Sequence, residues 1–490
     1  MRINNRWWVF LAPLILCSSI LEAQVLYNQV RLFGQQLEYA GYNLELKTQI
    51  HSFLKEEEVI GSMYVDSAGN FDFTLQIENA TYTYTDLGKI RAAIYLEPGT
   101  TYNIQLPPFQ PKDEQEKLNP FFSPETTTLG IINSESRNLN RQIVEFTDYF
   151  NYLFNKEALT LSMNNDEKRA NEICTFLDDK FIDTDPLFLT HKELTYIKLW
   201  VASSPRKLRG VIANHFLHQE INYELPAYTD AFMLLFKSFL PSGFQRSIRD
   251  SLEIKLKTRA SFLDLSNTII KDSLFIQHRE LGELILLYGI YQGFYNQSMD
   301  EATVIRIAKS AITEGYSLKI RDIAQALYQK LTKLRPGSPA PDFTLYNQEG
   351  QKRTLESYKG KFVYLNFVHT KNYTCQRDLE TMIQLQTIFK KNLDIVTVVV
   401  NENRDEMDAY IKQKKQKWDF LHILPYPQIL EQYNIMAVPA YYLISPDGKL
   451  LLSPAPTPEE NFRDAFVKEI QSFERQKLRE NPEEKRSIFR

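Results

Sequence analysis

The spacing of apolar residues changes twice along this chain of 490 residues, and each change predicts a different kind of fold. From about residue 28 to 106, apolar and polar residues alternate, as in half-buried strands. Tyr42, Leu44 and Leu46 show this alternation, and the turn 66–70 separates two further alternating runs. The pattern predicts a β-sandwich of antiparallel strands over residues 24–110. This segment shows no cluster of His, Cys or paired carboxylates with catalytic spacing.

From about residue 115 to 335 the apolar spacing becomes helical. Ile143, Phe146 and Phe150 fall on one face of an amphipathic helix. Long aromatic-rich stretches in this part favour a helical core over a cofactor site. The sequence therefore predicts a helical domain over 115–335, with further helices near 167–181, 187–203, 206–220, 229–239, 244–262, 273–293, 299–313 and 317–333.

After Pro336, strand and helix patterns alternate. Phe362–Phe367 and Leu393–Val400 are apolar runs typical of buried strands, and Met382 and Leu385 mark a helix between them. Two strands joined by a helix predict a parallel pair in an α/β domain, here residues 337–472. The polar, highly charged end at 473–490 is predicted to be a flexible tail.

The first 23 residues have the pattern of a secretory signal peptide. Arg2 and Arg6 precede an apolar run from Trp7 to Ile20, and Ala23 offers a cleavage site. The run is short for a membrane anchor, and Leu16 before Cys17 does not favour a lipoprotein, although both remain alternatives. We expect a periplasmic or secreted protein with no transmembrane span in the mature chain.

Composition excludes several classes of function. The net charge of −4 provides no basic field for nucleic acid. Three cysteines are too few for a disulfide scaffold or a four-cysteine zinc site, and no cofactor or metal is predicted. His215 and His218 have a spacing that could bind a metal, but solvated or locally paired histidines are the simpler interpretation. Cys17 would leave with the signal peptide, so Cys174, in a predicted helix, and Cys375 are expected to be free thiols.

The C-terminal quarter resembles the TlpA-like thioredoxin-fold thiol–disulfide oxidoreductases. The matching pieces occur in the family's order: Pro339–Leu345, Gly350, Gly360-Lys361, Val438-Pro439 and Ser445–Lys449. The resemblance implies a thioredoxin-like domain and a cis-proline at Val438-Pro439. It predicts a multi-domain α+β protein with a β-sandwich, a helical middle and a thioredoxin-like α/β domain.

The active-site segment of that family departs from its pattern in this chain. The family carries CxxC where this chain has Asn372 and Cys375, with Val368 and Lys371 in place of tryptophans. In the family, a thiolate at a helix N-terminus attacks a disulfide and the second thiol resolves the product. Asn372 cannot attack, but asparagine is a good helix N-cap. Asn372 therefore marks the position of a lost nucleophile, and the chain is not expected to be a dithiol oxidoreductase.

Two alternatives remain open for this segment. Cys375 could act as a monothiol polarised by His369, or it could be a structural thiol. Val438 and Pro439 could present backbone groups to an extended peptide, or they could form only a rigid turn. The prediction is a redox-inactive binding or scaffold protein, with an extended peptide or envelope protein as partner; the alternative is a monothiol thiol–disulfide oxidoreductase using Cys375.

The whole arrangement also resembles envelope proteins of Bacteroidetes. In that group the β-domain often carries a Tyr-x-Glu-Pro-Gly-like turn, here Tyr95–Gly99. The resemblance implies a cell-envelope setting. A third hypothesis is that the helical domain binds the partner and the thioredoxin-like fold serves only as a folding unit. The sequence indicates neither the ligand nor the oligomeric state.

Overall fold

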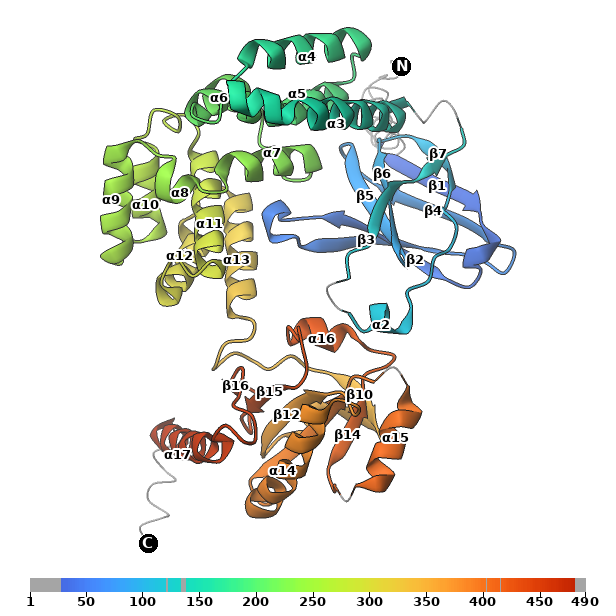
Figure 1. Cartoon of the computed structure of the whole chain (residues 1–490), viewed down its shortest axis with the longest axis vertical. Coiled ribbons are helices and arrows are strands. Elements are labelled where there is room, and N and C mark those ends of the chain that lie inside the picture. Colours follow the sequence, from blue (N-terminus) through green and yellow to red (C-terminus); the bar gives the residue numbers. More distant parts are fainter. Residues whose placement is uncertain (1–27, 120–121, 134–137, 402, 415, 481–490) are drawn as a thin grey trace, which may run out of the picture. The chain divides into compact units, whose positions relative to one another are not determined.

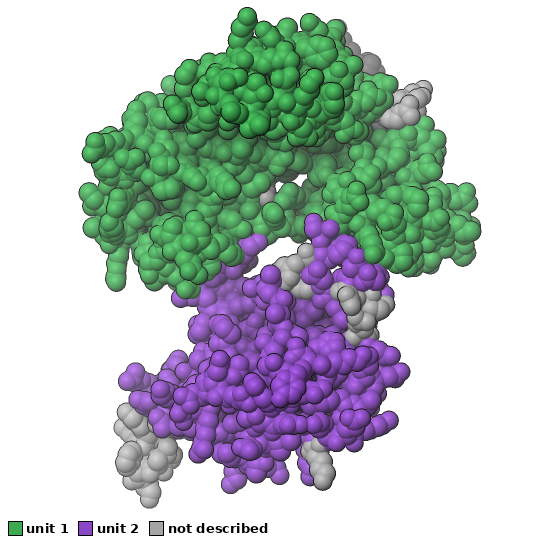
Figure 2. Space-filling view, viewed as in Figure 1, with its two compact units in different colours: residues 1–111, 124–328 green, residues 112–123, 329–490 purple. Residues whose placement is uncertain are grey.

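The computed structural model describes residues 28–119, 122–133, 138–401, 403–414 and 416–480. The chain forms two compact units, one of residues 1–111 and 124–328 and one of residues 112–123 and 329–490 (Figure 2). The predicted signal peptide, with Cys17, and the end of the predicted tail lie outside the described residues. No helix in the described ranges combines the length and the apolar character that crossing a membrane requires.

The first unit begins with a β-sandwich of two mixed sheets. One sheet has the strand order β4-β1-β7-β9 and the other β3-β2-β5-β6-β8. Apolar side chains from both sheets, including Val30, Leu46 and Ile94, form one buried core. The strands are β1 (Gln29–Gln35), β2 (Asn43–Gln49), β3 (Glu57–Tyr64), β4 (Asn70–Gln76), β5 (Thr81–Leu87), β6 (Ile90–Leu96), β7 (Thr101–Gln105), β8 (Glu125–Thr128) and β9 (Gly130–Ile131).

The sandwich differs from the expected one in two ways. The expectation of purely antiparallel strands is wrong, because β1 pairs with β7 and β6 with β8 in parallel. Strands β8 and β9 lie beyond residue 110, and each completes the edge of one sheet. Their few residues carry no apolar alternation, so the sequence pattern contained no signal for them.

Helices fill the rest of the first unit (Figure 1). Their apolar faces bury because apolar residues recur at helical spacing, as Ile143, Phe146 and Phe150 do on α3. The predicted stretch 244–262 forms α9, and α10 is a separate helix that the spacing did not distinguish. The helices are α3 (Asn138–Asn164), α4 (Glu167–Lys180), α5 (Pro186–Ser203), α6 (Leu208–His215), α7 (Pro226–Phe236), α8 (Phe239–Ser242), α9 (Arg246–Lys257), α10 (Phe262–Ile269), α11 (Arg279–Tyr295), α12 (Glu301–Glu314) and α13 (Leu318–Thr332).

A buried histidine links the sandwich to the helices within this unit. His51 follows β2, and its Nδ1 lies 2.9 Å from Glu56 Oε2. Its Nε2 lies 2.9 Å from Asp322 Oδ2 on α13. The imidazole can donate to both carboxylates only when both ring nitrogens carry a proton. The contact therefore joins parts of the chain that are far apart in sequence.

The second unit is a three-layer α/β domain. Its sheet has the order β11-β10-β14-β13-β12-β15-β16, with β12, β13 and β14 parallel. One face is covered by helices that bury Leu379, Tyr410 and Phe466, and the other by a layer that includes Leu430 and Tyr433. This is the predicted thioredoxin-like domain. Its elements are α2 (Glu114–Lys117), β10 (Thr344–Asn347), β11 (Lys352–Thr354), β12 (Phe362–Val368), α14 (Tyr373–Phe389), β13 (Leu393–Val399), α15 (Arg404–Gln413), β14 (Asp419–His422), α16 (Gln428–Gln432), β15 (Ala440–Ile444), β16 (Leu450–Leu452) and α17 (Phe462–Glu480).

Helix α17 continues into the segment that the sequence assigned to a flexible tail. The helix reaches Glu480, and Phe462 and Phe466 at its start are fully buried against the sheet. Phe473, the first residue of the predicted tail, also packs against that core. The helix therefore extends past the predicted start of the tail at residue 473, because apolar residues at helical spacing continue into this charged segment.

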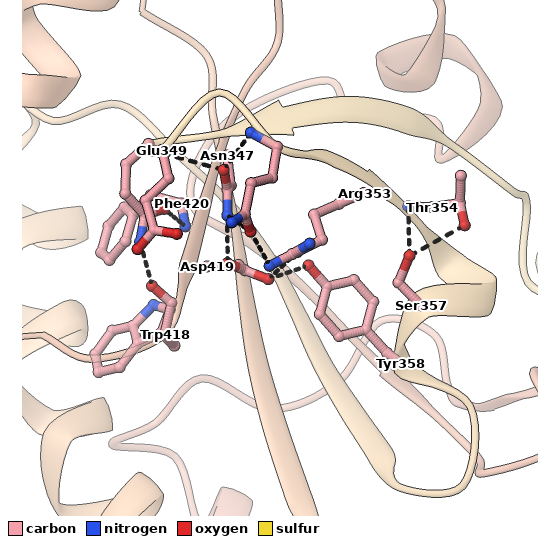
Figure 3. A network of polar contacts seen from close by, with 11 residues as sticks. Asn347, Glu349, Arg353, Thr354, Ser357, Tyr358, Trp418, Asp419 and Phe420 are labelled. Carbon is pink, nitrogen blue, oxygen red and sulfur yellow. Dashed lines mark hydrogen bonds and ion pairs between the residues drawn. The ribbon is translucent and has the colours of Figure 1, made fainter.

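A polar network holds β10 and β11 to β14 (Figure 3). The Asp419 carboxylate accepts hydrogen bonds from Asn347 Nδ2 at 3.0 Å, Arg353 Nε at 2.8 Å and the Tyr358 hydroxyl at 2.7 Å. Burial of Asp419 acts to raise its pKa, but these hydrogen bonds and the Arg353 charge outweigh burial and lower the pKa. The ionised carboxylate therefore stabilises this side of the sheet.

Candidate functional site

The loop between β12 and α14 brings together three of the residues singled out from the sequence: His369, Asn372 and Cys375. Strand β12 is buried along its whole length and ends at Val368, so the chain emerges at the carboxyl end of a parallel strand. The Asn372 N–H donates to the His369 carbonyl, which makes a tight turn before the helix. Parallel α/β sheets present their functional loops at this edge.

Asn372 is the N-cap of α14. Its backbone is extended, and its side-chain Oδ1 accepts a hydrogen bond from the Cys375 N–H at 3.2 Å. An N-cap satisfies one of the backbone donors that a helix start leaves unpaired. The capping role predicted for Asn372 is confirmed by this contact.

Cys375 lies on the inner face of the first turn of α14. The side chain has no exposed surface, and it packs in a core with Leu379, Met382 and Val368. Burial raises the pKa of the thiol, and the nearby Asp378 carboxylate raises it further, while backbone hydrogen bonds at His369 and Cys375 act in the opposite direction. The thiol is therefore protonated and shielded.

Val438 and Pro439 lie at the same edge of the sheet as this loop. Strands β12 and β15 are antiparallel, with Phe367 opposite Ala440. Val438, two residues before Ala440, packs against the core that contains Val368 and Cys375. The Val438–Pro439 peptide bond is cis, as the resemblance implied. The five predicted residues therefore meet at one end of the sheet.

Several residues that the sequence did not single out shape this site. Asn401, which follows β13, accepts the Thr370 N–H at 2.8 Å and donates to the Thr370 hydroxyl at 2.6 Å. The same amide donates to Glu406 at 2.8 Å, and Lys371 pairs with Glu406 at 2.5 Å. Asn401 directly follows a predicted buried strand, and a polar residue at that position is the sequence feature that could have identified it as part of the site. Together these contacts fix the loop that precedes α14.

A buried carboxylate lies one helical turn beyond Cys375. Asp378 is 2% exposed, and its Oδ2 accepts a hydrogen bond of 2.5 Å from the Tyr441 hydroxyl on β15. Its Oδ1 is buried without a hydrogen-bond partner. The pair ties α14 to β15 and adds a negative charge beside the thiol.

The comparisons with known proteins concern this unit. Residues 336–452 match the model of the AhpC/TSA family. Thiol-disulfide oxidoreductase ResA of Bacillus cereus (strain ATCC 10987 / NRS 248) is 30% identical over 128 residues, which cover 26% of this chain and 73% of that protein. ResA of Geobacillus kaustophilus (strain HTA426) is 31% identical over 124 residues, covering 25% of this chain and 71% of the relative. The chain belongs to the ResA-like thiol–disulfide oxidoreductase family.

Solved structures match a similar share of the chain. A putative thiol-disulfide oxidoreductase from Bacteroides vulgatus is 24% identical, with a TM-score of 0.27, and covers 28% of this chain and 98% of its own. A putative thiol:disulfide interchange protein DsbE from Chlorobium tepidum is 25% identical, with a TM-score of 0.26, and covers 28% of this chain and 97% of its own. The family membership rests on the sequence matches to the C-terminal domain, about a quarter of the chain.

The remaining candidate residues lie in the first unit. Cys174 on α4 is buried and free, as predicted, and burial, with the charge of Asp178, raises its pKa to about 12. The His215 ring stacks on Trp200 with centroids 4.4 Å apart. His218 Nε2 lies 3.4 Å from Glu193 Oε2. In the described ranges, no group of three or more His, Cys, Asp or Glu side chains is arranged to hold a metal ion.

Proposed function

We propose that the C-terminal domain is a thioredoxin-fold module without dithiol chemistry, and that it acts by binding an extended peptide. The observation that carries the proposal is the hydrogen bond from the Cys375 N–H to the Asn372 side chain. The family pattern has its first cysteine at the position of Asn372. Here that position holds an amide that caps the helix and cannot form a thiolate.

The burial of Cys375 supports the proposal that the domain has lost thiol–disulfide exchange. A thiol must ionise and reach a disulfide sulfur before exchange can begin, and burial opposes both. Resolution of a mixed disulfide needs a second thiol. The other cysteine of the described residues, Cys174, is itself buried and belongs to a different compact unit. A monothiol reaction would need an external thiol and an opening of the core around Cys375.

The surface beside the site supports a binding role. Tyr373 at the start of α14 is 76% exposed, and Met436 before the Val438-Pro439 loop is 70% exposed. Each of these two side chains offers apolar surface that a bound peptide would cover. The loop before β15 has backbone groups that an extended peptide could pair with, in the manner of an added strand. His369 completes the same edge of the sheet.

We also propose that the protein is exported to the periplasm or beyond the cell, with residues 1–23 removed as a signal peptide. The charged start, the apolar run and the small residue Ala23 support this. The domain limits 24–110, 115–335 and 337–472 stay predictions from the sequence, and β8 and β9 of the sandwich lie beyond the first of these limits. N-terminal sequencing of the chain from the envelope fraction of an expressing cell should begin at Gln24. A chain that begins at Met1 would contradict export by cleavage.

The test of lost chemistry is an insulin-reduction assay with dithiothreitol as reductant. Wild type and Cys375→Ser should both match the protein-free rate. Asn372→Cys, which restores a cysteine at an exposed helix start, is the matched variant and should reduce insulin faster than wild type. Turnover by wild type that disappears in Cys375→Ser would establish the monothiol alternative instead.

The test of binding uses S-carboxymethylated insulin B chain, a peptide that has no free thiol or disulfide. Fluorescence anisotropy of the labelled peptide should show saturable binding to wild type and to Cys375→Ser. The variants Tyr373→Asp and Met436→Asp should bind at least about tenfold more weakly, since each places a charge on the apolar surface. Absence of binding to wild type, or equal binding by both aspartate variants, would contradict the proposal.

A further inference from the structure

Strand β8 in the first unit is an edge strand with one free side. Within the part of the chain that the structure describes, it is the last strand of its sheet and its one partner is β6. All four of its residues, Glu125 to Thr128, are exposed. Proteins usually protect such edges with lysine, proline or a bulge, because unpaired backbone groups can accept another strand. Apart from the charge of Glu125, the stretch Thr126–Thr128 has no lysine, proline or bulge, and threonine favours the extended conformation.

The free backbone groups belong to Thr126 and Thr128. On either side of them, the Glu125 N–H donates to the Lys89 carbonyl at 3.0 Å and the Leu129 N–H to the Ala93 carbonyl at 2.8 Å. Residues of a strand alternate in the direction of their backbone groups, so Thr127 also faces β6. The N–H and C=O groups of Thr126 and Thr128 therefore face away from β6, where the described residues form no neighbouring strand.

Past the end of β8, the Asn140 side chain occupies the backbone hydrogen-bonding groups of Tyr95 on β6, where a neighbouring strand would otherwise bind. Asn140 on α3 accepts the Tyr95 N–H and donates to the Tyr95 carbonyl, both at 2.8 Å. Asn140 is 3% exposed, so this contact is a fixed part of the fold. The edge available to an incoming strand is thus limited to β8.

A cavity of about 260 Å³ lies along β8. One wall is the face of α3 that carries Val144, Thr147 and Asp148, and Tyr82 and Tyr95 of the sheet also line it. A groove between an edge strand and a helix is the setting in which extended peptides add to a sheet. The cavity volume is suited to a side chain of the added strand rather than to a large ligand.

The charges around the cavity favour a basic side chain. Among the described residues that line it there is no lysine or arginine, and Asp148 supplies a carboxylate. His191 also lines it, but burial and the charge of Lys198 lower the pKa of this histidine to about 4, so it is neutral near pH 7. The aromatic faces of Tyr82 and Tyr95 can also attract a cation.

We propose that β8 and this cavity bind an extended peptide as an added strand, with a basic side chain in the cavity near Asp148. Backbone groups of the peptide pair with Thr126 and Thr128. This site is in the first unit and is independent of the binding role proposed for the C-terminal domain.

The experiment uses the full chain and a fluorescein-labelled, end-blocked peptide of sequence Thr-Val-Thr-Lys-Thr-Val. Thr128→Pro removes the outward N–H and leaves the hydrogen bonds of Thr127 and Leu129 to β6 intact. Thr128→Val keeps the N–H and is the matched control. Wild type and Thr128→Val should bind alike, and Thr128→Pro about tenfold more weakly, which corresponds to the loss of one hydrogen bond. Circular dichroism and a urea denaturation midpoint equal to that of Thr128→Val would show that the variant is folded.

A second pair of measurements tests the charge. Asp148→Asn should weaken binding of the lysine peptide about fivefold, and a peptide with Glu in place of Lys should bind wild type more weakly than the lysine peptide does. No binding to wild type, equal binding by Thr128→Pro, or equal binding of the two peptides would overturn the proposal. Concentration-dependent dimers that Thr128→Pro abolishes, without peptide binding, would assign the edge to a second copy of the chain and also overturn it.

Discussion

Helices α4 and α14 each carry a buried cysteine, but the two cysteines occupy very different positions. Cys174 lies past the middle of α4, among apolar residues of the first unit. Cys375 is the third residue of α14, close to the positive end of the helix dipole and to the Asn372 cap. A helix N-terminus ordinarily lowers the pKa of a cysteine. Yet both thiols have raised pKa values.

The difference between the helices shows which effect decides the state of Cys375. Burial is the largest influence on both thiols, and an aspartate one turn away, Asp178 or Asp378, adds to it. The backbone groups at the start of α14 oppose burial without overcoming it. A position at a helix start is therefore insufficient for reactivity when the sulfur faces the core. Exchange would need an accessible second cysteine, such as the one that Asn372→Cys supplies at the exposed helix start.

The largest expected effect comes from the packing of the two helices. Leu379 on α14 and Leu177 on α4 are both fully buried, so Leu→Ala at either position should cost about 2–5 kcal/mol of unfolding free energy. Hydrogen exchange measured peptide by peptide should place the loss for Leu379→Ala in residues 329–480 and that for Leu177→Ala in the first unit. Equal deprotection of both units by either variant would show that they unfold as one.

The next effect concerns the response of the second unit to pH. The pKa of Asp419 is lowered in the folded state, so its contribution to stability is present above about pH 4 and is lost as pH falls through the folded-state value. Asp419→Asn should destabilise the second unit by about 1–3 kcal/mol at pH 7, because its partners lose a charged acceptor. The difference from wild type should shrink below pH 3.

Chemical denaturation at pH 7 and at pH 3, followed by hydrogen exchange, measures this effect. Asp464→Asn on α17 is the control, since Asp464 is exposed and makes no comparable network. A wild-type-to-Asp419→Asn difference that stays constant across this range would mean that the carboxylate does not supply the stability.

The smallest expected loss of stability comes from replacing the N-cap residues of the two helices. Asn372 caps α14, and Asp166 caps α4 through the Arg169 N–H at 2.9 Å. Replacement of either cap by alanine should cost about 1 kcal/mol. Asn372→Ser, which retains a capping oxygen, should recover most of the loss in urea denaturation. If Asn372→Ala has no effect on stability, the capping role assigned to this residue is wrong.

Much of the fold was predictable because apolar spacing is a local signal. The buried strand Phe362–Val368 and the face of α14 at Met382 and Leu385 follow directly from it. Strand β8 was not predictable in this way, because its threonines contain no apolar alternation and it is held by pairing with β6. The parallel direction of that pairing depends on contacts between distant segments, which periodicity does not record.

The candidate site was predictable in its residue types but not in its surroundings. The NxxC spacing identified Asn372 and Cys375, and asparagine's preference for helix starts predicted the cap. The Asp378–Tyr441 contact joins residues 63 positions apart, and the contact of Asn401 with Thr370 joins residues 31 apart. Such partners become visible only when the sheet brings β12, β13 and β15 together.

The most direct test of the central claim is the alkylation rate of Cys375 in the folded protein. Iodoacetamide labelling, read by mass spectrometry at pH 7 to 9 in the Cys174→Ala variant, should label Cys375 only as fast as the second unit opens, and labelling should become rapid in guanidinium chloride. The claim of a buried, protonated thiol predicts this protection. Rapid labelling of the folded protein at pH 7 would contradict it and would indicate an accessible thiolate.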